Sequence, residues 1–230
     1  MQKEIIPAVM PSSIHDIESA AISVRHVAQT IQLDLMDGKY VPESTWPFTT
    51  MGNHDLEMAK KGDFELALWE ELNYELDLMV AKPEEDLETY ISLGASRIIF
   101  HFGSVHRWDN IQNLDPVTRS FLEIGVAVTI YDDLDKVFPL IENKVVDFIQ
   151  VMGIARIGFQ GEPFEPKCLA LIHRIKEQYP ELPISIDGGV SEDTIPLLNE
   201  AGVTRFVSGS GVFGYGMADE NVEYFYTLVE

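Results

Sequence analysis

The chain has 230 residues, of which 46% are hydrophobic and 23% are charged, a composition that excludes disordered and fibrous proteins. Sixteen Lys and Arg against 38 Asp and Glu give a net charge of −22, which argues against nucleic acids and anionic membranes as partners. No apolar run approaches the ~20 residues that cross a bilayer, and the first residues lack the apolar stretch of a secretory signal. We therefore expect a cytoplasmic protein.

Short apolar segments alternate with amphipathic segments along the chain. The predicted strands cover residues 5–10, 31–36, 75–80, 97–100, 126–130, 148–152, 184–187 and 205–208. Helices are predicted at residues 14–29, 85–93, 115–122, 168–179 and 194–201, among others. Eight strand-helix units without a linker predict an α/β fold, a single-domain (β/α)8 TIM barrel over residues 1–230. The lone Cys168 allows no internal disulfide, and we expect it to be a core side chain of its helix.

A doubly wound α/β sheet is the alternative arrangement of such units. Its nucleotide-binding form has Gly-x-Gly-x-x-Gly after the first strand, whereas this chain has Pro-Ala-Val-Met-Pro-Ser-Ser at residues 7–13. The barrel is therefore the favoured prediction.

Acidic side chains occupy alternate positions on three of the predicted strands. In a barrel, alternate residues point inward, which groups together Gln32, Asp34, Met36, Glu75, Asp77, Met79, Ser185 and Asp187. Asp34, Asp77 and Asp187 lie near the carboxyl ends of their strands, where active sites of TIM barrels are found. Unpaired buried carboxylates repel one another unless a cation neutralises them or one takes up a proton. The pattern favours a metal site or a catalytic pair over carboxylates that merely cap loops.

Glycines follow the last three predicted strands, at residues 158 and 161, 188 and 189, and 209 and 211. Exposed backbone N–H groups at these turns are the usual phosphate site of the fold. In so acidic a protein, local donors of this kind or a metal are needed to hold a small anion.

Several motifs then occur in order along nearly the whole chain. They are Gln-Leu-Asp-Leu-Met-Asp-Gly-Lys-Tyr-Val-Pro at 32–42, Asp-Leu-Met-Val at 77–80, Phe-His at 100–101, Val-Met at 151–152, Gly-Phe-Gln-Gly at 158–161, Asp-Gly-Gly-Val at 187–190, Gly-Ser at 209–210 and Phe-Gly at 213–214. Together they resemble the ribulose-phosphate 3-epimerase family.

The resemblance implies an isomerase that inverts C3 of a ketopentose 5-phosphate. Asp34 and Asp187 would be its two acid/base groups on opposite faces of the sugar, and a divalent metal would stabilise the enediolate between the two proton transfers. The substrate contacts that it implies, or that the glycine pattern suggests, are Met36, Met79, His101, Gly158, Gln160, Gly161, Gly188, Gly189, Gly209 and Ser210. The family also suggests a homo-oligomer.

The chain departs from the family pattern at the metal ligands. Gln32 and Asp77 stand where the family has His, so the expected set of Gln32, Asp34, Asp77 and Asp187 offers oxygen only and suits Mg²⁺ or Mn²⁺ better than Zn²⁺. The same departures leave open a site without metal, and a catalytically silent protein that binds sugar phosphates. Gln160 at a glycine position leaves open a different phosphosugar. An orotidine-type decarboxylase would need Lys where Met36 stands.

Overall fold

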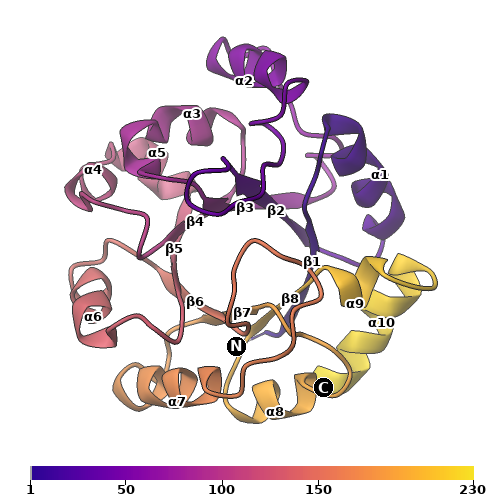
Figure 1. The fold of residues 1–230 in the computed structure, drawn as a ribbon, viewed down its shortest axis with the longest axis vertical. Coiled ribbons are helices and arrows are strands. Elements are labelled where there is room, and N and C mark those ends of the chain that lie inside the picture. The colour runs from indigo at the N-terminus through magenta and orange to yellow at the C-terminus, as the bar shows by residue number, and fades with distance from the viewer. Residues whose placement is uncertain (1) are drawn as a thin grey trace.

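Eight parallel strands form a closed barrel in the computed structural model, which describes residues 2–230 (Figure 1). In chain order they are β1 (Glu4–Val9), β2 (Thr30–Met36), β3 (Asn73–Met79), β4 (Arg97–His101), β5 (Glu123–Val128), β6 (Phe148–Met152), β7 (Ile184–Asp187) and β8 (Arg205–Ser208). Each strand pairs with the next, and β8 closes the barrel by pairing with β1. The predicted (β/α)8 fold is confirmed.

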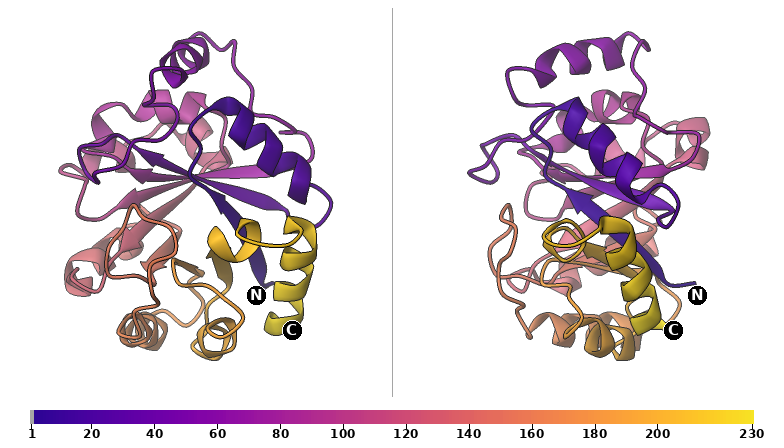
Figure 2. Two further views of the ribbon diagram at one scale, coloured as in Figure 1. Left: turned by 45° about the vertical axis from the view of Figure 1, so that its right-hand side comes forward. Right: turned by 90° about the vertical axis from the view of Figure 1, so that its right-hand side faces the viewer.

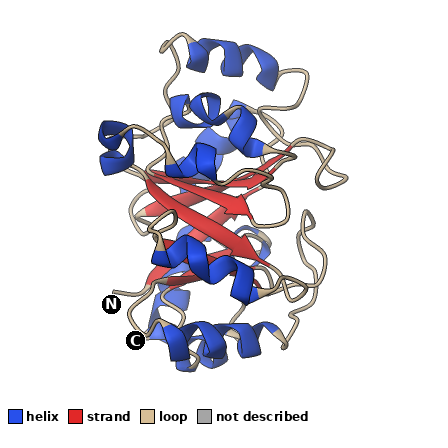
Figure 3. Cartoon of the chain, turned by 90° about the vertical axis from the view of Figure 1, so that its left-hand side faces the viewer, coloured by secondary structure: helices blue, strands red, loops and turns tan. Residues whose placement is uncertain are grey.

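Helices surround the barrel (Figures 2 and 3). They are α1 (Ile14–Val24), α2 (Gly52–Lys60), α3 (Leu87–Ser92), α4 (Asp109–Gln112), α5 (Pro116–Phe121), α6 (Leu134–Glu142), α7 (Cys168–Gln178), α8 (Ile195–Glu200), α9 (Ser210–Phe213) and α10 (Ala218–Val229), with a 3₁₀ turn η1 (Pro83–Glu85) before α3. Among residues 2–230 no helix combines the length and hydrophobicity needed to span a membrane.

Two predicted elements, one strand and one helix, have a boundary that differs from the structure by more than two residues. Strand β5 covers residues 123–128 rather than 126–130, and it contains Gly125, where a Cβ would lie 2.4 Å from the Phe148 ring. Beyond β5 the chain turns, because the backbone and hydroxyl of Thr129 both donate to Asp132. Helix α1 ends at Val24 rather than at residue 29, since a turn bonded to the Val24 carbonyl leads directly into β2.

The two faces of the strands are chemically different. Their outward side chains are apolar and pack beneath the helices in one continuous core, which includes Leu33, Leu76 and Ile186. Cys168 of α7 is fully buried in this core, as predicted. The inward face instead carries buried Gln32, Asp34, Asp77 and other polar groups, which therefore need partners inside the barrel.

Charged side chains close the amino-terminal end of the barrel. Arg97 donates to Glu4, Glu75 and Glu123 at 3.0, 3.1 and 2.9 Å, and Arg205 donates to Glu123 at 2.7 Å. These five side chains come from five different strands. A ligand therefore has access to the barrel interior from the opposite end, where the strands end.

Candidate active site

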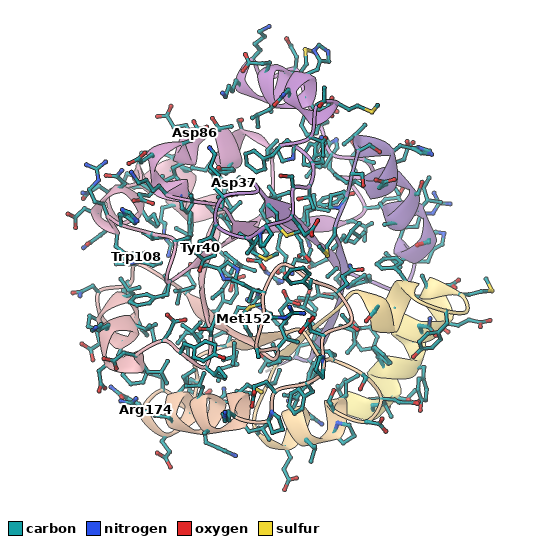
Figure 4. All side chains as sticks on the ribbon, in the orientation of Figure 1. Asp37, Tyr40, Asp86, Trp108, Met152 and Arg174 are labelled. Atoms are coloured by element: carbon teal, nitrogen blue, oxygen red, sulfur yellow. The ribbon has the colours of Figure 1, made fainter. Side chains whose placement is uncertain are left out.

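A cavity of about 310 Å³ opens at the carboxyl ends of the strands. Asp34 and Asp187 supply carboxylates to it, and Met10, Met79 and Met152 form an apolar wall. Figure 4 shows Met152 near the middle of the barrel. The turns after β6, β7 and β8 contribute residues 158–162, 188–191 and 208–210 to the lining.

Three carboxylates converge inside the barrel, as the strand pattern predicts. Asp34, Asp77 and Asp187 each place an oxygen within 4.8 Å of the others. Asp34 and Asp77 are paired across β2 and β3, and Asp187 comes from β7. Asp77 is fully buried and does not line the cavity, so it lies behind the other two.

Amide groups separate these carboxylates. The Gln32 Nε2 donates to Asp34 Oδ1 at 2.8 Å and to Asp187 Oδ2 at 2.9 Å. Gln150 Nε2 lies 3.4 Å from Asp77 Oδ2 and 3.5 Å from Asp187 Oδ2. Each carboxylate of the pair that faces the cavity is thus held by neutral donors.

His101 is the basic group of the cluster. Its Nε2 lies 2.9 Å from Asp77 Oδ1, and both side chains are buried. Burial by itself lowers the pKa of His101, but the charge and hydrogen bond of Asp77 outweigh it and raise the pKa. Asp77 therefore has a basic partner, which Asp34 and Asp187 lack.

Burial and mutual repulsion act on the cavity pair. Burial, followed by the charges of Asp187 and Asp77, raises the pKa of Asp34 well above its usual range. Burial and the charge of Asp77 likewise raise the pKa of Asp187. Two such groups titrate as a unit, and burial and repulsion favour one shared proton on the pair over two negative charges.

The same cluster fits a hard divalent cation. Three carboxylates supply the charge, and the Gln32 Oε1 is buried without a hydrogen-bond partner. Exchanging the nitrogen and oxygen of the Gln32 amide leaves its shape unchanged. The oxygen would then lie 2.8 and 2.9 Å from carboxylate oxygens of Asp34 and Asp187, similar to the ~3 Å between neighbouring ligand oxygens around Mg²⁺.

Glycine turns form the rim of the cavity. Gly188 and Gly189 have φ values of +92° and +68°, a conformation that other residues adopt rarely. A Cβ on either residue would also lie 2.8 Å from atoms of the loop after β6, those of Ile154 and Phe164. Only glycine lets the turn after β7 approach that loop so closely, and its backbone thereby faces the cavity.

The loop between β6 and α7 crosses the barrel mouth (Figure 1). A bridge between Ile154 and Phe164 closes its base, and Arg156 pairs with Glu162 across its tip. Gly158 at the tip has a φ of +86°, and a Cβ on it would lie 2.9 Å from the Val41 side chain in the loop after β2. The loop after β6, which lines the cavity, thus packs closely against the loop after β2.

Most of the predicted contact residues lie at the cavity, and two do not. Those that line it are Asp34, Met79, Gly158, Gln160, Gly161, Asp187, Gly188, Gly189, Gly209 and Ser210. Met36 is fully buried in a cluster with Val41 and Met79, and His101 lies beneath the cavity against Asp77. The sequence does not predict Gln150 as a site residue. Its one indication in the sequence is that an amide side chain stands in the middle of the apolar strand β6.

The model of the ribulose-phosphate 3-epimerase family matches residues 4–213. The chain belongs to this family. The cytoplasmic isoform of ribulose-phosphate 3-epimerase from Oryza sativa subsp. japonica is 29% identical over 214 residues, which cover 92% of this chain and 87% of the relative. Ribulose-phosphate 3-epimerase from Schizosaccharomyces pombe is 25% identical and covers 93% of this chain and 88% of the relative.

Solved structures with other activities in their names share the fold. The structure of 3-keto-L-gulonate-6-phosphate decarboxylase from Vibrio cholerae matches with a TM-score of 0.70 and 12% identity, covering all of this chain and 98% of that one. A likeness at this identity shows the TIM barrel alone, and the barrel hosts many different reactions. The family, rather than the barrel, therefore directs the functional assignment.

Proposed function

We propose that the chain interconverts ketopentose 5-phosphates, ribulose 5-phosphate and xylulose 5-phosphate or a close analogue, by inverting C3. The observation that carries the proposal is the pair of cavity carboxylates, Asp34 and Asp187, which both contact Gln32 Nε2. Membership of the ribulose-phosphate 3-epimerase family supports it independently.

Inversion at C3 needs one proton acceptor and one proton donor. The C3 proton is acidic because C2 is a carbonyl, so the ionised member of the Asp34–Asp187 pair removes it and leaves an enediolate. The protonated member returns a proton to C3 from the other face. No other atom is exchanged, and the pair ends with its proton on the opposite carboxylate.

The remaining residues hold this pair in place. Gln32 fixes the distance between the two carboxylates, and Gln150 lies behind Asp187. The thioethers of Met10, Met79 and Met152 bring no proton to the cavity and limit the access of water to the enediolate.

We infer that Asp34, Asp77 and Asp187 hold a divalent cation, Mg²⁺ or Mn²⁺ rather than Zn²⁺, together with the oxygen of Gln32 once its amide is turned over and no longer donates to Asp34 and Asp187. The support is the all-oxygen donor set and the three convergent carboxylates. When bound, such a cation stabilises negative charge on the C2 and C3 oxygens. Titration calorimetry with MnCl2 tests this inference. The control Asp135→Asn removes an exposed carboxylate outside the cavity lining and should bind Mn²⁺ like the wild type.

We also propose a homo-oligomer. Exposed Tyr215, Met217 and Tyr224 lie around the start of α10, where Asn221 donates to the Tyr215 carbonyl and brings the segments together. Light scattering coupled to gel filtration measures the mass directly, and a mass of 25.9 kDa for the chain in solution contradicts this proposal.

Solvent exchange tests the reaction itself. Ribulose 5-phosphate is incubated with the protein in D2O, with and without added Mg²⁺, Mn²⁺ or Zn²⁺, and deuterium at C3 is followed by NMR. We expect deuterium at C3 together with xylulose 5-phosphate. Absence of exchange under every metal condition excludes ribulose 5-phosphate as the substrate.

A further inference from the structure

A second hollow lies in the outer layer of helices. It is a groove of about 780 Å³ between η1 and α3 on one side and α4 and the start of α5 on the other. Figure 1 shows α3, α4 and α5 next to one another in the ring of helices. None of the residues that line the groove also lines the active-site cavity. The groove is therefore a separate feature that the proposed reaction does not use.

The groove is strongly acidic. Among the described residues that line it there is no Lys, Arg or His, whereas six carry carboxylates: Glu84, Glu85, Asp86, Glu88, Asp109 and Asp115. Asp115 caps α5, and Glu85 pairs with the exposed Lys82. Glu88 and Asp109 are exposed in the first turns of α3 and α4. The charge that remains attracts cations to this surface.

Glu84 is the one buried carboxylate of the groove. Its side chain is 3% exposed, and its Oε1 accepts from the backbone N–H groups of His106 and Arg107 at 2.9 and 3.1 Å. Its Oε2 is buried and has no hydrogen-bond partner within residues 2–230. A buried carboxylate oxygen without a donor costs free energy. Because Glu84 lines the groove, a ligand that carries N–H groups can supply the missing donor.

The fold holds Glu84 in this place. The side-chain amide of Asn110 in α4 donates to the Glu84 carbonyl at 3.0 Å and thereby connects the two walls of the groove. Pro83, the first residue of η1, is buried next to it. An exposed carboxylate could turn to water, but the contacts around Glu84 leave its second oxygen inside the protein. The missing donor is thus a property of the fold.

The shape of the groove favours an extended cation over a metal ion. Within residues 2–230, the one group of three or more acidic or metal-binding side chains close enough to share an ion lies inside the barrel. The groove also has an apolar part, formed by Leu87, Ile91 and Leu114. Linear aliphatic polyamines match both features, because their ammonium groups are separated by runs of methylene. A second copy of this chain, with its net charge of −22, does not.

We propose that the groove between α3 and α4 binds a linear aliphatic polyamine. One ammonium group donates to Glu84 Oε2, and the methylene groups pack on Leu87, Ile91 and Leu114. A second ammonium group lies at the rim, where Glu88 is exposed. Binding stabilises the folded chain and leaves inversion at C3 unchanged, because the groove shares no residue with the cavity.

Binding of spermidine tests the proposal directly. Isothermal titration calorimetry is run in about 0.15 M NaCl, which screens the general attraction between a cation and an acidic chain. It compares the wild type with Glu84→Gln, Glu88→Gln and the matched control Glu177→Gln, on an exposed residue of α7. Glu84→Gln keeps the oxygen that accepts from the backbone and removes only the charge. n-Butylamine, with a single ammonium group, is the matched ligand.

The wild type is expected to bind spermidine at a single saturable site. Loss of a hydrogen bond between charged groups raises the Kd about tenfold or more in Glu84→Gln. Loss of an exposed ion pair raises it about two- to fivefold in Glu88→Gln. Glu177→Gln binds like the wild type, and n-butylamine binds to the wild type at least about tenfold more weakly than spermidine. Exchange at C3 of ribulose 5-phosphate is the same in all four proteins.

Three results would overturn the proposal. The first is a wild type without saturable spermidine binding. The second is an equal change of Kd in Glu84→Gln and Glu177→Gln, because general attraction then explains the binding. The third is a Lys- and Leu-rich peptide that binds more tightly than spermidine and loses affinity in Glu84→Gln, which makes the groove a docking surface for a basic protein segment.

Circular dichroism verifies that Glu84→Gln is folded. If this variant does not fold, Glu88→Gln and Asp109→Asn decide the question, since both alter exposed side chains at the rim. A spermidine Kd that equals the wild-type value in both of these variants then overturns the proposal.

Discussion

His101 Nε2 lies 2.9 Å from Oδ1 of Asp77, and the two side chains are buried to 1% and 0% exposure inside the barrel. This contact divides the three carboxylates into two kinds. Asp77 has a basic partner that compensates its charge, whereas Asp34 and Asp187 face the cavity with amide donors alone. The pair without a basic partner is the one suited to exchanging protons with a substrate.

Removing the imidazole is expected to destabilise the barrel. In His101→Leu the Asp77 carboxylate stays buried without its partner, which lowers the free energy of unfolding by about 3–5 kcal/mol. Urea unfolding at pH 7 measures this, with the exposed His54→Leu as control. Adding Asp77→Asn to His101→Leu removes the buried charge and restores part of the loss; an unchanged midpoint in His101→Leu contradicts the ion pair.

Replacing either cavity carboxylate is expected to abolish inversion while the fold persists. Asp34→Asn and Asp187→Asn each lower the rate of C3 inversion by about 10²–10⁴-fold, because the pair then lacks either its base or its acid. Both substitutions remove a negative charge from a crowded site, so the circular dichroism spectrum and urea midpoint match or exceed those of the wild type. A variant that keeps more than a tenth of wild-type activity argues against the assigned role.

The ionic network at the amino-terminal end is expected to stabilise the closed barrel. Arg97→Met leaves the fully buried Glu75 and its neighbours Glu4 and Glu123 without their shared donor, at a cost of about 3–5 kcal/mol in unfolding free energy. The control Arg174→Met breaks an exposed pair with Asp135, which is worth less than about 1 kcal/mol. Figure 4 places Arg174 at the periphery. Equal effects of the two substitutions contradict this prediction.

Cys168 is expected to resist alkylation in the native protein. Burial raises the pKa of its thiol to about 11, while an unfolded thiol titrates near ~8.5. The folded state thus holds the thiol proton more tightly than the unfolded state does. The stability that this proton confers on the folded state is complete below pH ~8.5 and is lost as the pH rises towards 11. Iodoacetamide at pH 8 should label the protein in urea and leave the native protein largely unmodified, as mass spectrometry measures; rapid native labelling excludes a buried thiol.

The local pattern of the chain determines the fold and much of the site. Alternating residues on β2, β3 and β7 place Asp34, Asp77 and Asp187 on the inward face, because side chains of a strand alternate by geometry alone. The position of these residues near the carboxyl ends of their strands predicts which end of the barrel is chemically active. Element boundaries are harder to predict where tertiary packing overrides propensity, as at β5, where Gly125 makes room for the Phe148 ring.

Distances between side chains from different strands depend on the closed barrel. Gln150 belongs to no motif, and its approach to Asp77 and Asp187 follows from the stagger of β3, β6 and β7. The sequence by itself determined which residues point inward and which turns carry glycine, since both follow from local backbone geometry. Only the tertiary structure decided that His101 pairs with Asp77, because closure of the barrel sets the contacts between residues distant in the chain.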